Sequence, residues 1–466
     1  MKGIITGIKF APNPVDNIYT VVGERCLSFK CETMLNLYDK ITIAPKAAEG
    51  EKVAAKSIKI DEERATPAEY KKFLEKLVGE LNIMSPRRKM KVTLKVFEEP
   101  AKKMEKRMRN SAVKLAKCLI TGTPVIVRFH NDADGASGAV SLFNSVAKVQ
   151  AQLKQKEIAI GWRMNKSIAY SRESYYSDYA FFNGFASIEK PAVLISDFGT
   201  SRESEEAIKM CETKYDLIWL DHHPIYNGFP RHQIKFYINP WDNGGNSDFT
   251  AGYLLSLFAE LLAPGDTENM KKASLIGDFS VHANRNDEVG QKYAIVLDYL
   301  TSKKGESDNL TPRYINTILE DKEKFREMTE RASRLLSEAV ELGVNKVKHS
   351  RSRSGMDIYR LDFNHIAKED DYPLPGRYSS RLQEKLQEVS GNNRTITLVH
   401  YGSYISIRAT RMAAESVNLH EIVENLKQSV EGIYSFGGHS AAFSIRSDKD
   451  HINDVAKTVA SALETV

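Results

Sequence analysis

The chain has 466 residues, of which 42% are hydrophobic and 27% charged, and its formal net charge is +5 at pH 7. These values are typical of a globular protein, and the length predicts two to four domains rather than one. No run approaches the roughly 18 apolar residues of a membrane span, the first residues do not begin a secretory signal, and the four cysteines match no zinc motif. We therefore expect a cytoplasmic protein with reduced thiols and no membrane partner.

Residues 1–60 are predicted to form a β-rich module. Short runs of β-branched and aromatic residues, at Ile4–Ile8, Tyr19–Val22 and Ile41–Ile43, are separated by turn signals such as Pro12-Asn13-Pro14 and Glu49-Gly50. Such runs predict a small barrel or sheet, which we interpret as an auxiliary module for nucleic acid or a protein partner.

Residues 61–118 are predicted to be a helical, basic connector. Thr66-Pro67-Ala68-Glu69 has the pattern of a helix start with a capping box, and Pro86 would end that helix. A second helix is expected from Ala101 to about Leu119. Lysines and arginines are concentrated in two groups, at Arg87, Arg88, Lys89, Lys91, Lys95, Lys102, Lys103, Lys106, Arg107, Arg109, Lys114 and Lys117, and at Lys346, Lys348, His349, Arg351 and Arg353. Each group is either a solvated charged face or a contact with phosphates, whose binding would weaken steeply with salt.

An alternation of apolar runs with helical stretches predicts an α/β catalytic domain over 119–300, with a mostly parallel sheet and helices on both faces. Three of the apolar runs end in acidic residues and histidines. His130-Asn131-Asp132-Ala133-Asp134-Gly135 follows Val125–Phe129, Asp197 follows Ala192–Ser196, and Asp221-His222-His223 follows Leu217–Leu220. Ligands of open α/β sheets gather beyond the carboxyl ends of the strands, so we expect these side chains to meet at one site.

The spacing of His130, Asp132 and Asp134 indicates a bound cation. Three ionisable groups within five residues, directly after an apolar strand, would repel one another and be costly to desolvate unless a cation compensates them. An Asp that ends a strand commonly caps the next helix, so each motif alone is a weak signal, and it is the combination that favours a metal site. Carboxylate and imidazole donors suit manganese or zinc better than a soft metal.

On these motifs the chain resembles the DHH phosphoesterases, and among them the RecJ-like single-strand nucleases of the archaeal type. His130–Gly138 is similar to the first motif of the family, Val193–Asp197 to the second, Asp221–Pro224 to the third and Ala273–Asp278 to the fourth. Later in the chain, Ser406-Ile407-Arg408 is similar to the SxR element of the family's second domain, and Gly437–Ala442 to its GGHxxA signature. The chain departs from the pattern at His130, where bacterial RecJ enzymes tend to have Asp, and at Phe443 and Ser444, where the signature usually continues with Ala and Gly.

The resemblance implies a two-metal phosphodiesterase, with manganese as the first choice of ion and magnesium as the second. It implies metal ligands at His130, Asp132, Asp134, Asp197, His222 and Asp278, with Asp197 bridging the two ions. Asp221 would orient an imidazole, and His223 would face the scissile phosphate as a charge stabiliser or proton donor.

The helical spacing of apolar residues predicts a helical linker at 301–346, and the resemblance implies a smaller α/β domain at 347–466, the DHH-associated substrate-binding domain. There the phosphates of the substrate would be held by Ser406, Arg408, Gly437, Gly438 and His439. The substrate would lie in a cleft between this domain and the catalytic domain.

The favoured function is a RecJ-like exonuclease on single-stranded nucleic acid, with DNA and a 5′→3′ direction preferred, in DNA repair, recombination or replication. Two alternatives stay open. A small-substrate phosphoesterase would act on pyrophosphate, cyclic dinucleotides or very short oligonucleotides. A non-catalytic scaffold would accompany a replicative helicase complex, but every expected ligand position is filled here, which argues against a lost activity and is compatible with an active nuclease that docks on such a complex.

Overall fold

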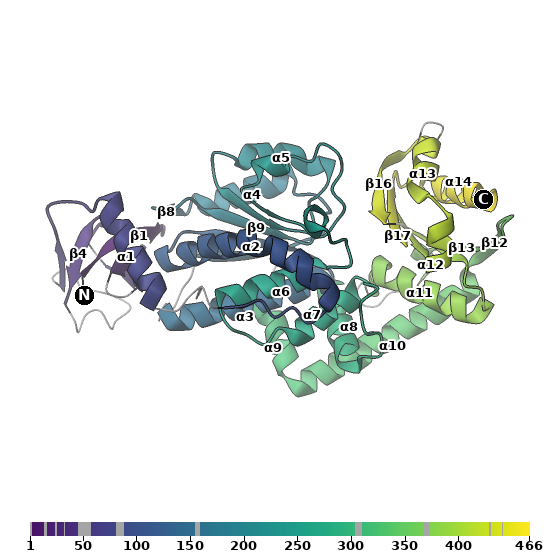
Figure 1. The fold of residues 1–466 in the computed structure, drawn as a ribbon, viewed down its shortest axis with the longest axis horizontal. Coiled ribbons are helices and arrows are strands. Elements are labelled where there is room, and N and C mark those ends of the chain that lie inside the picture. The colour runs from purple at the N-terminus through teal and green to yellow at the C-terminus, as the bar shows by residue number, and fades with distance from the viewer. Residues whose placement is uncertain are drawn as a thin grey trace. The chain divides into compact units, whose positions relative to one another are not determined.

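The chain forms two compact units in the computed structural model (Figure 1). Unit 1 comprises Met1–Ala294 and Asp308–Thr317, and unit 2 comprises Ile295–Ser307 and Ile318–Val466. The structure describes residues 2–13, 16–23, 26–31, 33–44, 57–80, 88–153, 159–302, 310–366, 372–427, 430–439 and 441–466. The features predicted at Pro14, Glu49-Gly50, Pro86 and Arg87 lie outside these residues. Within the described ranges, no helix combines the length and the apolar character needed to cross a bilayer.

The predicted β-rich module at the N-terminus is confirmed as an antiparallel sheet. Its strands, in the order β3-β2-β1-β4-β5, are β3 (Cys26–Lys30), β2 (Ile18–Gly23), β1 (Lys2–Lys9), β4 (Lys40–Ile43) and β5 (Ile58–Ile60). The central strand β1 is buried on both faces, because Ile5 packs into a small core of its own whereas Ile4 packs into the core shared with the helices that follow. Strand β8 (Phe185–Ser187), far along the chain, pairs antiparallel with β1 and joins this sheet to the rest of unit 1.

Two helices follow this sheet. Helix α1 (Pro67–Glu80) begins with the predicted capping box, because the Glu69 carboxylate accepts from the Thr66 backbone N–H at 2.8 Å and the Glu69 N–H donates to Thr66 Oγ1 at 3.3 Å. Helix α2 (Lys95–Thr121) begins six residues before the predicted start at Ala101 and contains Pro100. The early start is explained by packing, since the Phe97 ring stacks on Phe249 with centroids 4.2 Å apart.

The centre of unit 1 is a five-stranded parallel sheet, as predicted. The strands lie in the order β11-β10-β9-β6-β7, with bounds β11 (Phe236–Ile238), β10 (Asp216–Leu220), β9 (Ala192–Ser196), β6 (Val125–His130) and β7 (Ile160–Asn165). The strand β7, next to β6, had not been recognised in the sequence, where its polar and glycine residues interrupt the apolar pattern.

Helices cover both faces of this sheet (Figure 1). Alternate residues of the strands, such as Val127 and Leu194, pack into the core with α2, α3 (Ala133–Leu153), α6 (Ala251–Leu262) and α7 (Glu268–Gly277). The intervening residues, such as Ile126 and Trp219, pack against α4 (Arg172–Phe182) and α5 (Glu205–Cys211). This arrangement confirms the predicted α/β class of residues 119–300 and explains why their strands are nearly continuous apolar runs.

Unit 2 has its own sheet and core. Its sheet has the order β12-β13-β14-β15-β17-β16, with bounds β12 (Lys348–Arg351), β13 (Asp357–Asp362), β14 (Thr395–Tyr401), β15 (Tyr404–Ala409), β17 (Ala442–Ser447) and β16 (Ile433–His439). Only the β13–β14 pair is parallel among these described strands. The helices of this part of the chain are α8 (Glu288–Ser302), α9 (Pro312–Glu320), α10 (Lys322–Lys346), α11 (Pro375–Ser390), α12 (Arg411–Ser416), α13 (Leu419–Lys427) and α14 (Ile452–Glu464), of which α8 and α9 are divided between the two units.

Candidate metal centre

The predicted motifs meet at the point where the strand order of the parallel sheet reverses. From β6 the chain crosses to β7 on one side, and it later returns to form β9 on the other side of β6. The loops that leave β6 and β9 therefore diverge, which opens a site for a ligand at the carboxyl ends of these strands. His130 is the last residue of β6, Asp197 directly follows β9, and Asp221 directly follows β10.

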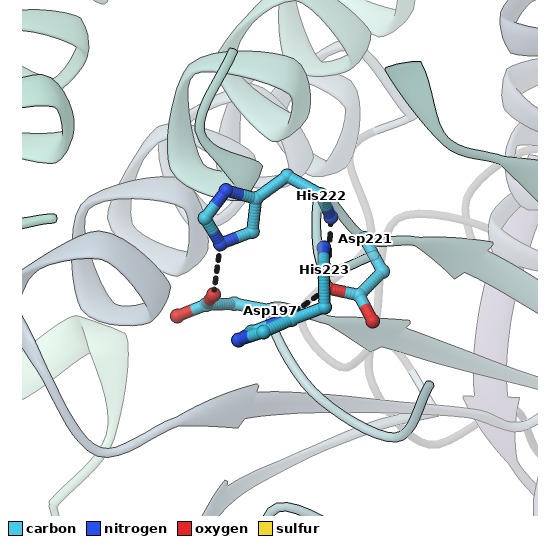
Figure 2. A group of neighbouring side chains, drawn as sticks. All are labelled: Asp197, Asp221, His222 and His223. Atoms are coloured by element: carbon cyan, nitrogen blue, oxygen red, sulfur yellow. Dashed lines mark hydrogen bonds and ion pairs between the residues drawn. The ribbon is translucent and has the colours of Figure 1, made fainter. Parts of the chain in front are cut away.

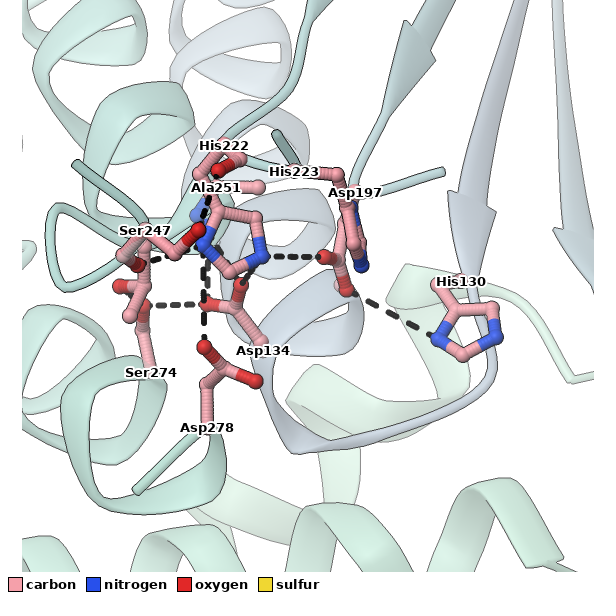
Figure 3. Close-up of polar contacts among 12 residues, drawn as sticks. His130, Asp134, Asp197, His222, His223, Ser247, Ala251, Ser274 and Asp278 are labelled. Atoms are coloured by element: carbon pink, nitrogen blue, oxygen red, sulfur yellow. Dashed lines mark hydrogen bonds and ion pairs between the residues drawn. The ribbon is translucent and has the colours of Figure 1, made fainter. Parts of the chain in front are cut away.

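Asp197 lies beside His222 (Figure 2) and between His222 and His130 (Figure 3). Its Oδ1 is 3.3 Å from His222 Nε2 and its Oδ2 is 3.9 Å from His130 Nδ1. The residue is 97% buried, and its φ of 68° is a strained backbone conformation of the kind that clusters at functional sites. Burial, with the charges of Asp132 and Asp134, raises the pKa of Asp197 well above its ordinary value. Within the described part of the chain, Asp197 Oδ2 accepts no hydrogen bond, so this buried oxygen is available to a cation.

The first motif places one imidazole and one carboxylate beside Asp197. His130 Nδ1 is 2.7 Å from Asp132 Oδ2, and Asp132 Oδ1 accepts the Gly135 N–H at 2.9 Å. Burial opposes ionisation of Asp132, but His130 and the Gly135 N–H outweigh it and lower the pKa of this carboxyl. Gly135 is required by the tight turn, since a Cβ there would lie 2.5 Å from the His130 carbonyl oxygen. Asp132 is thus an ionised carboxylate held at the start of α3.

Asp134 is more completely bonded by the protein than the sequence suggested (Figure 3). Its two oxygens accept the backbone N–H groups of Ala251 and Gly252 at 2.9 Å, at the start of α6, and the hydroxyl of Ser274. Oδ2 is 3.8 Å from His222 Nε2. A carboxylate has about four acceptor positions, so three donors leave room for one further contact. Asp134 therefore joins the site to α6 and α7 and keeps the capacity to bind one ion.

His222 is oriented by a backbone carbonyl. Its Nδ1 is 2.7 Å from the Ser247 carbonyl oxygen, which as an acceptor requires a proton on Nδ1 and leaves Nε2 directed at Asp197 and Asp134. This is the arrangement of a metal-binding histidine, whose second nitrogen is held by a hydrogen bond. Burial would lower the pKa of His222, but the carboxylates around it, first Asp278, raise it well above its ordinary value.

Asp221 and His223 form a second oriented pair in the same loop (Figure 2). Asp221 is fully buried and its Oδ1 accepts the backbone N–H of His222 at 2.8 Å, that of His223 at 3.3 Å and His223 Nδ1 at 2.8 Å, while Thr200 donates to Oδ2. Burial opposes ionisation, but these donors, and first the charge of His223, lower the pKa of Asp221. The His223 side chain is 47% exposed. Its Nε2 is therefore free of Asp221 and available at the surface of the site.

Asp278, from the fourth predicted motif, directly follows α7 and lies beside His222. Its Oδ2 is 3.6 Å from His222 Nδ1. Desolvation, together with the neighbouring Asp134 carboxylate, raises the pKa of Asp278 to about 7. The six residues predicted as metal ligands all lie near Asp197 or His222, but Asp134 and Asp278 belong to neither group of potential ligand atoms that lie within 4.8 Å of one another.

The donor set fits one or two divalent cations. Potential ligand atoms lie within 4.8 Å of one another in two groups among the described residues. One group is His130, Asp132 and Asp197, and the other is Asp197, Asp221, His222 and His223. Asp197 belongs to both groups. Four of the carboxylates predicted as ligands lie around His222 and His130, and these two imidazoles do not carry enough positive charge to balance them. Carboxylate oxygens combined with imidazole nitrogens are typical ligands of manganese, magnesium or zinc rather than of soft metals.

The predicted phosphate-holding residues lie in unit 2 and share one region of its sheet. Arg408 on β15 is in register with Ala442 on β17, which is in register with His439 at the end of β16. Ser406 and Gly437 are related in the same way through Ser444. The SxR and GGHxxA elements, far apart in sequence, are therefore adjacent, although Ser440 lies outside the described residues.

Helix α11 supports the SxR element. Arg408 Nε donates to Ser380 Oγ at 2.8 Å, and Ser406 Oγ is 2.9 Å from Ser379 Oγ. A Cβ on Gly437 would meet nothing within 4 Å among the described residues. The backbone at Gly437 is therefore open, and the hydrogen bond to Ser380 on α11 fixes the Arg408 side chain.

Several residues around the metal centre were not recognised in the sequence. Thr200 and Ser274 donate to Asp221 and Asp134, respectively. Asn239 donates to the His223 carbonyl at 3.0 Å, and the Ser247 carbonyl holds His222. A backbone carbonyl can come from any residue type, so nothing in the sequence marks Ser247.

No protein-family model matches the chain. "Uncharacterized protein MJ1198" of Methanocaldococcus jannaschii is 23% identical over 407 residues, covering 75% of this chain and 53% of that protein, so the chain spans about half the length of the curated relative it matches. The solved "Member of s1p family of ribosomal proteins PF0399 DHH domain" has a TM-score of 0.72 at 20% identity, covering 86% of this chain and 98% of that one. RecJ of Thermus thermophilus in complex with Mn2+ has a TM-score of 0.49 at 15% identity, covering 82% of this chain and 57% of that one.

Proposed function

The chain has the fold of DHH-domain proteins, as its motifs predicted, and on this premise we propose that it is a RecJ-like, divalent-metal-dependent phosphodiesterase. The observation that carries the proposal is the position of Asp197. One of its oxygens faces His222, the other faces His130, and the second oxygen accepts no hydrogen bond in the described chain. The strained backbone of this buried carboxylate, and its position between two groups of potential ligands, support the assignment of Asp197 as a ligand shared by two cations.

The proposed ligands divide between two cation positions, one on each side of Asp197. His130 and Asp132 would bind on one side of Asp197, and Asp134, His222 and Asp278 on the other. Bound divalent cations would polarise a phosphoryl oxygen, favour ionisation of an attacking water and stabilise the leaving oxygen. Manganese is the first choice of ion and magnesium the second.

The remaining residues of the loop would act on the substrate. His223 is directed by Asp221, which fixes a proton on Nδ1, so Nε2 faces outward as the atom that contacts the scissile phosphate. A protonated Nε2 would stabilise charge on the phosphate or donate a proton to the leaving oxygen. Asp221 has no capacity left after its backbone, imidazole and hydroxyl donors, which supports a positioning role.

In unit 2 the proposed role of Ser406, Arg408, Gly437, Gly438 and His439 is to hold phosphates of the substrate. The supporting observations are the register that groups these residues and the hydrogen bond from Arg408 Nε to Ser380. A second hydrogen bond, from Arg408 Nη1 to the Ile407 carbonyl oxygen at 3.1 Å, also holds the guanidinium in place, so an anion that contacts it causes little further loss of conformational entropy.

The proposed substrate is single-stranded nucleic acid, with DNA and a 5′→3′ direction favoured. Basic side chains on α2 are exposed at Lys95, Lys102, Lys103, Lys106 and Arg107. Other members of the predicted basic groups form ion pairs within the protein. Lys114 is buried 3.0 Å from Asp216, Arg109 pairs with Glu105, and His349 and Arg351 pair with Asp357. The exposed basic side chains of α2 are therefore the candidate contact with the strand. The proposal also includes a role in repair, recombination or replication, with a replicative helicase complex as a candidate partner.

The test is digestion of DNA and RNA strands labelled at either end, with chelator, manganese or magnesium. We expect metal-dependent, stepwise shortening of single strands, and the end that loses label first gives the direction. Asp266→Asn, which changes an exposed carboxylate outside the cluster, is the matched control for Asp197→Asn. Equal turnover of pyrophosphate or dinucleotides and of long strands would favour the small-substrate phosphoesterase, and absence of any metal-dependent hydrolysis would contradict the proposal.

A further inference from the structure

Trp241 is 44% exposed although its indole N–H is held beside the metal centre. It lies in the short 3₁₀ turn Pro240–Asn243 that follows β11. Its Nε1 donates to the His222 backbone oxygen at 3.1 Å and to Ser247 Oγ at 3.2 Å. Ser247 Oγ also donates to the His222 oxygen, at 2.9 Å, while the Ser247 carbonyl accepts from His222 Nδ1. The indole therefore belongs to the same hydrogen-bond system as the imidazole of His222.

The turn that carries Trp241 is anchored on both sides. The Trp241 backbone N–H donates to Asn239 Oδ1 at 3.0 Å, and Asn239 Nδ2 donates to the His223 carbonyl at 3.0 Å. Asn243 Nδ2 donates back to the Asn239 carbonyl at 2.8 Å. A ring fixed at its backbone and at its indole nitrogen loses little conformational entropy when a ligand covers it. Single exposed aromatic residues are common on proteins, but this one is immobilised one hydrogen bond from a proposed metal ligand.

The basic side chain of Lys103, on α2, lies next to the same turn. A Cβ added at Gly244 would lie 3.3 Å from Lys103 Nζ, and one added at Gly245 would lie 3.4 Å from Pro100 on the same helix. Helix α2 therefore packs on this turn and places the ammonium group of Lys103 next to Gly244. An aromatic surface beside ammonium groups is the combination by which proteins hold single strands, because bases stack on the ring and phosphates pair with the cations.

We propose that Trp241 stacks on the base of a nucleotide adjacent to the scissile phosphate, so that an unpaired base at this position is part of substrate recognition. The inference rests on the proposed phosphodiesterase function and specifies its substrate class. A base inside a duplex is already stacked on its neighbours, whereas a base in a single strand is free to stack on the indole. Pyrophosphate has no base and gains nothing from this contact.

The experiment uses the full chain and oligothymidylates in which one abasic residue is moved along the strand one position at a time. Binding is measured by fluorescence anisotropy of a labelled strand in chelator, and cleavage is measured separately with manganese. The variants are Trp241→Ala, Trp241→Phe, which keeps a ring but loses the N–H, and Tyr314→Ala, which removes a 40% exposed aromatic on α9 as a control. Thermal unfolding shows whether each variant remains folded.

For the wild type, we expect an abasic residue at one position to raise Kd by roughly 5- to 160-fold, the range for one base stacked on an aromatic side chain. Trp241→Ala should raise Kd for the intact strand by a similar factor and show no further loss at that position. Trp241→Phe should retain most of the affinity, and Tyr314→Ala should behave as the wild type. The proposal is overturned if Trp241→Ala binds like the wild type, if the abasic position matters equally in both, or if Phe is as harmful as Ala.

The two measurements keep this proposal separate from the proposed activity. Base-dependent binding through Trp241 without hydrolysis under any metal would contradict the phosphodiesterase and leave the stacking contact established. Metal-dependent hydrolysis with no position-specific effect of the abasic residue would establish the phosphodiesterase and overturn the role of Trp241.

Discussion

The Nδ1 of His222 lies 2.7 Å from the backbone carbonyl oxygen of Ser247, and this contact directs Nε2 of the same ring at Asp197, 3.3 Å away. A main-chain oxygen from a loop 25 residues later thus selects the tautomer of the imidazole. Such a contact fixes both the orientation and the basicity of a metal-binding histidine. It also couples the loop that follows β11 to the chemistry of the metal centre.

The first prediction concerns Asp197→Asn. In the metal-free protein the ionised carboxylate is disfavoured, as its raised pKa shows, so the neutral amide should leave the metal-free Tm unchanged or higher. The wild type should gain about 2.7 kcal/mol in its free energy of unfolding when manganese is present at one hundred times its Kd. The variant should lose this gain together with hydrolysis. Differential scanning fluorimetry with and without manganese measures the change, and a full metal-induced shift in the variant would rule out Asp197 as a ligand.

The second prediction is that metal affinity falls as the pH falls below about 7. The pKa of Asp278 in the metal-free protein is raised to about 7 by desolvation and by Asp134. Below that pH this carboxyl holds a proton that a cation must displace, so the apparent Kd should rise about tenfold per pH unit from this group alone. Above that pH the same group adds no dependence.

Calorimetry of manganese binding in buffers of different ionisation enthalpy gives the number of protons released. Asp278→Asn should bind more weakly and show a smaller release near pH 7. If the wild type and this variant release the same number of protons at every pH, Asp278 does not bind the ion.

The third prediction concerns Asp221→Asn. One Asp221 oxygen accepts three N–H groups, two from the backbone and one from the His223 ring. The amide keeps an oxygen for these three donors but loses the charge of the carboxylate, so its hold on the His223 ring should weaken. We expect kcat to fall about 10- to 100-fold, the usual effect of removing such a partner, while the Kd for manganese changes much less. A loss confined to metal affinity would instead make Asp221 a direct ligand.

The fourth prediction tests the phosphate-holding role of Arg408. Arg408→Ala should weaken binding of a single strand by about 1.5–3 kcal/mol, the range for removal of a charge-assisted hydrogen bond. Cleavage of a small activated phosphodiester should survive, because no residue of the metal centre changes. Arg411→Ala, which removes a 90% exposed arginine three positions later, controls for charge. Equal losses on the strand and on the small ester would assign Arg408 to the chemistry or to folding.

The fifth prediction concerns the exposed lysines of α2. Replacing Lys102, Lys103 and Lys106 by Gln should reduce the slope of log Kd against log salt for a single strand by about 0.7 for each phosphate that the helix no longer neutralises. The same change at Lys427, Lys449 and Lys457, which are exposed in unit 2, alters the net charge equally. If both triple variants reduce the slope to the same extent, the effect comes from net charge and α2 does not bind the strand.

The sequence by itself determined the local features of this protein. The apolar runs located β6, β9 and β10, the capping box located the start of α1, and the acidic and histidine motifs identified side chains that the fold brings together. These predictions hold because each depends on residue type and short spacing. Parallel strands end at one edge of a sheet, so ligands that follow them must converge.

The tertiary structure decided what depends on distant contacts. It placed β8 beside β1, started α2 at Lys95 to stack Phe97 on Phe249, and buried Lys114 against Asp216 in the middle of a basic stretch. It also directed three donors from α6 and α7 at Asp134, and it joined Trp241 to His222 through a backbone oxygen. Backbone carbonyls and N–H groups are the same in every residue, so hydrogen bonds made by them leave no mark in the sequence and form only when the chain is folded.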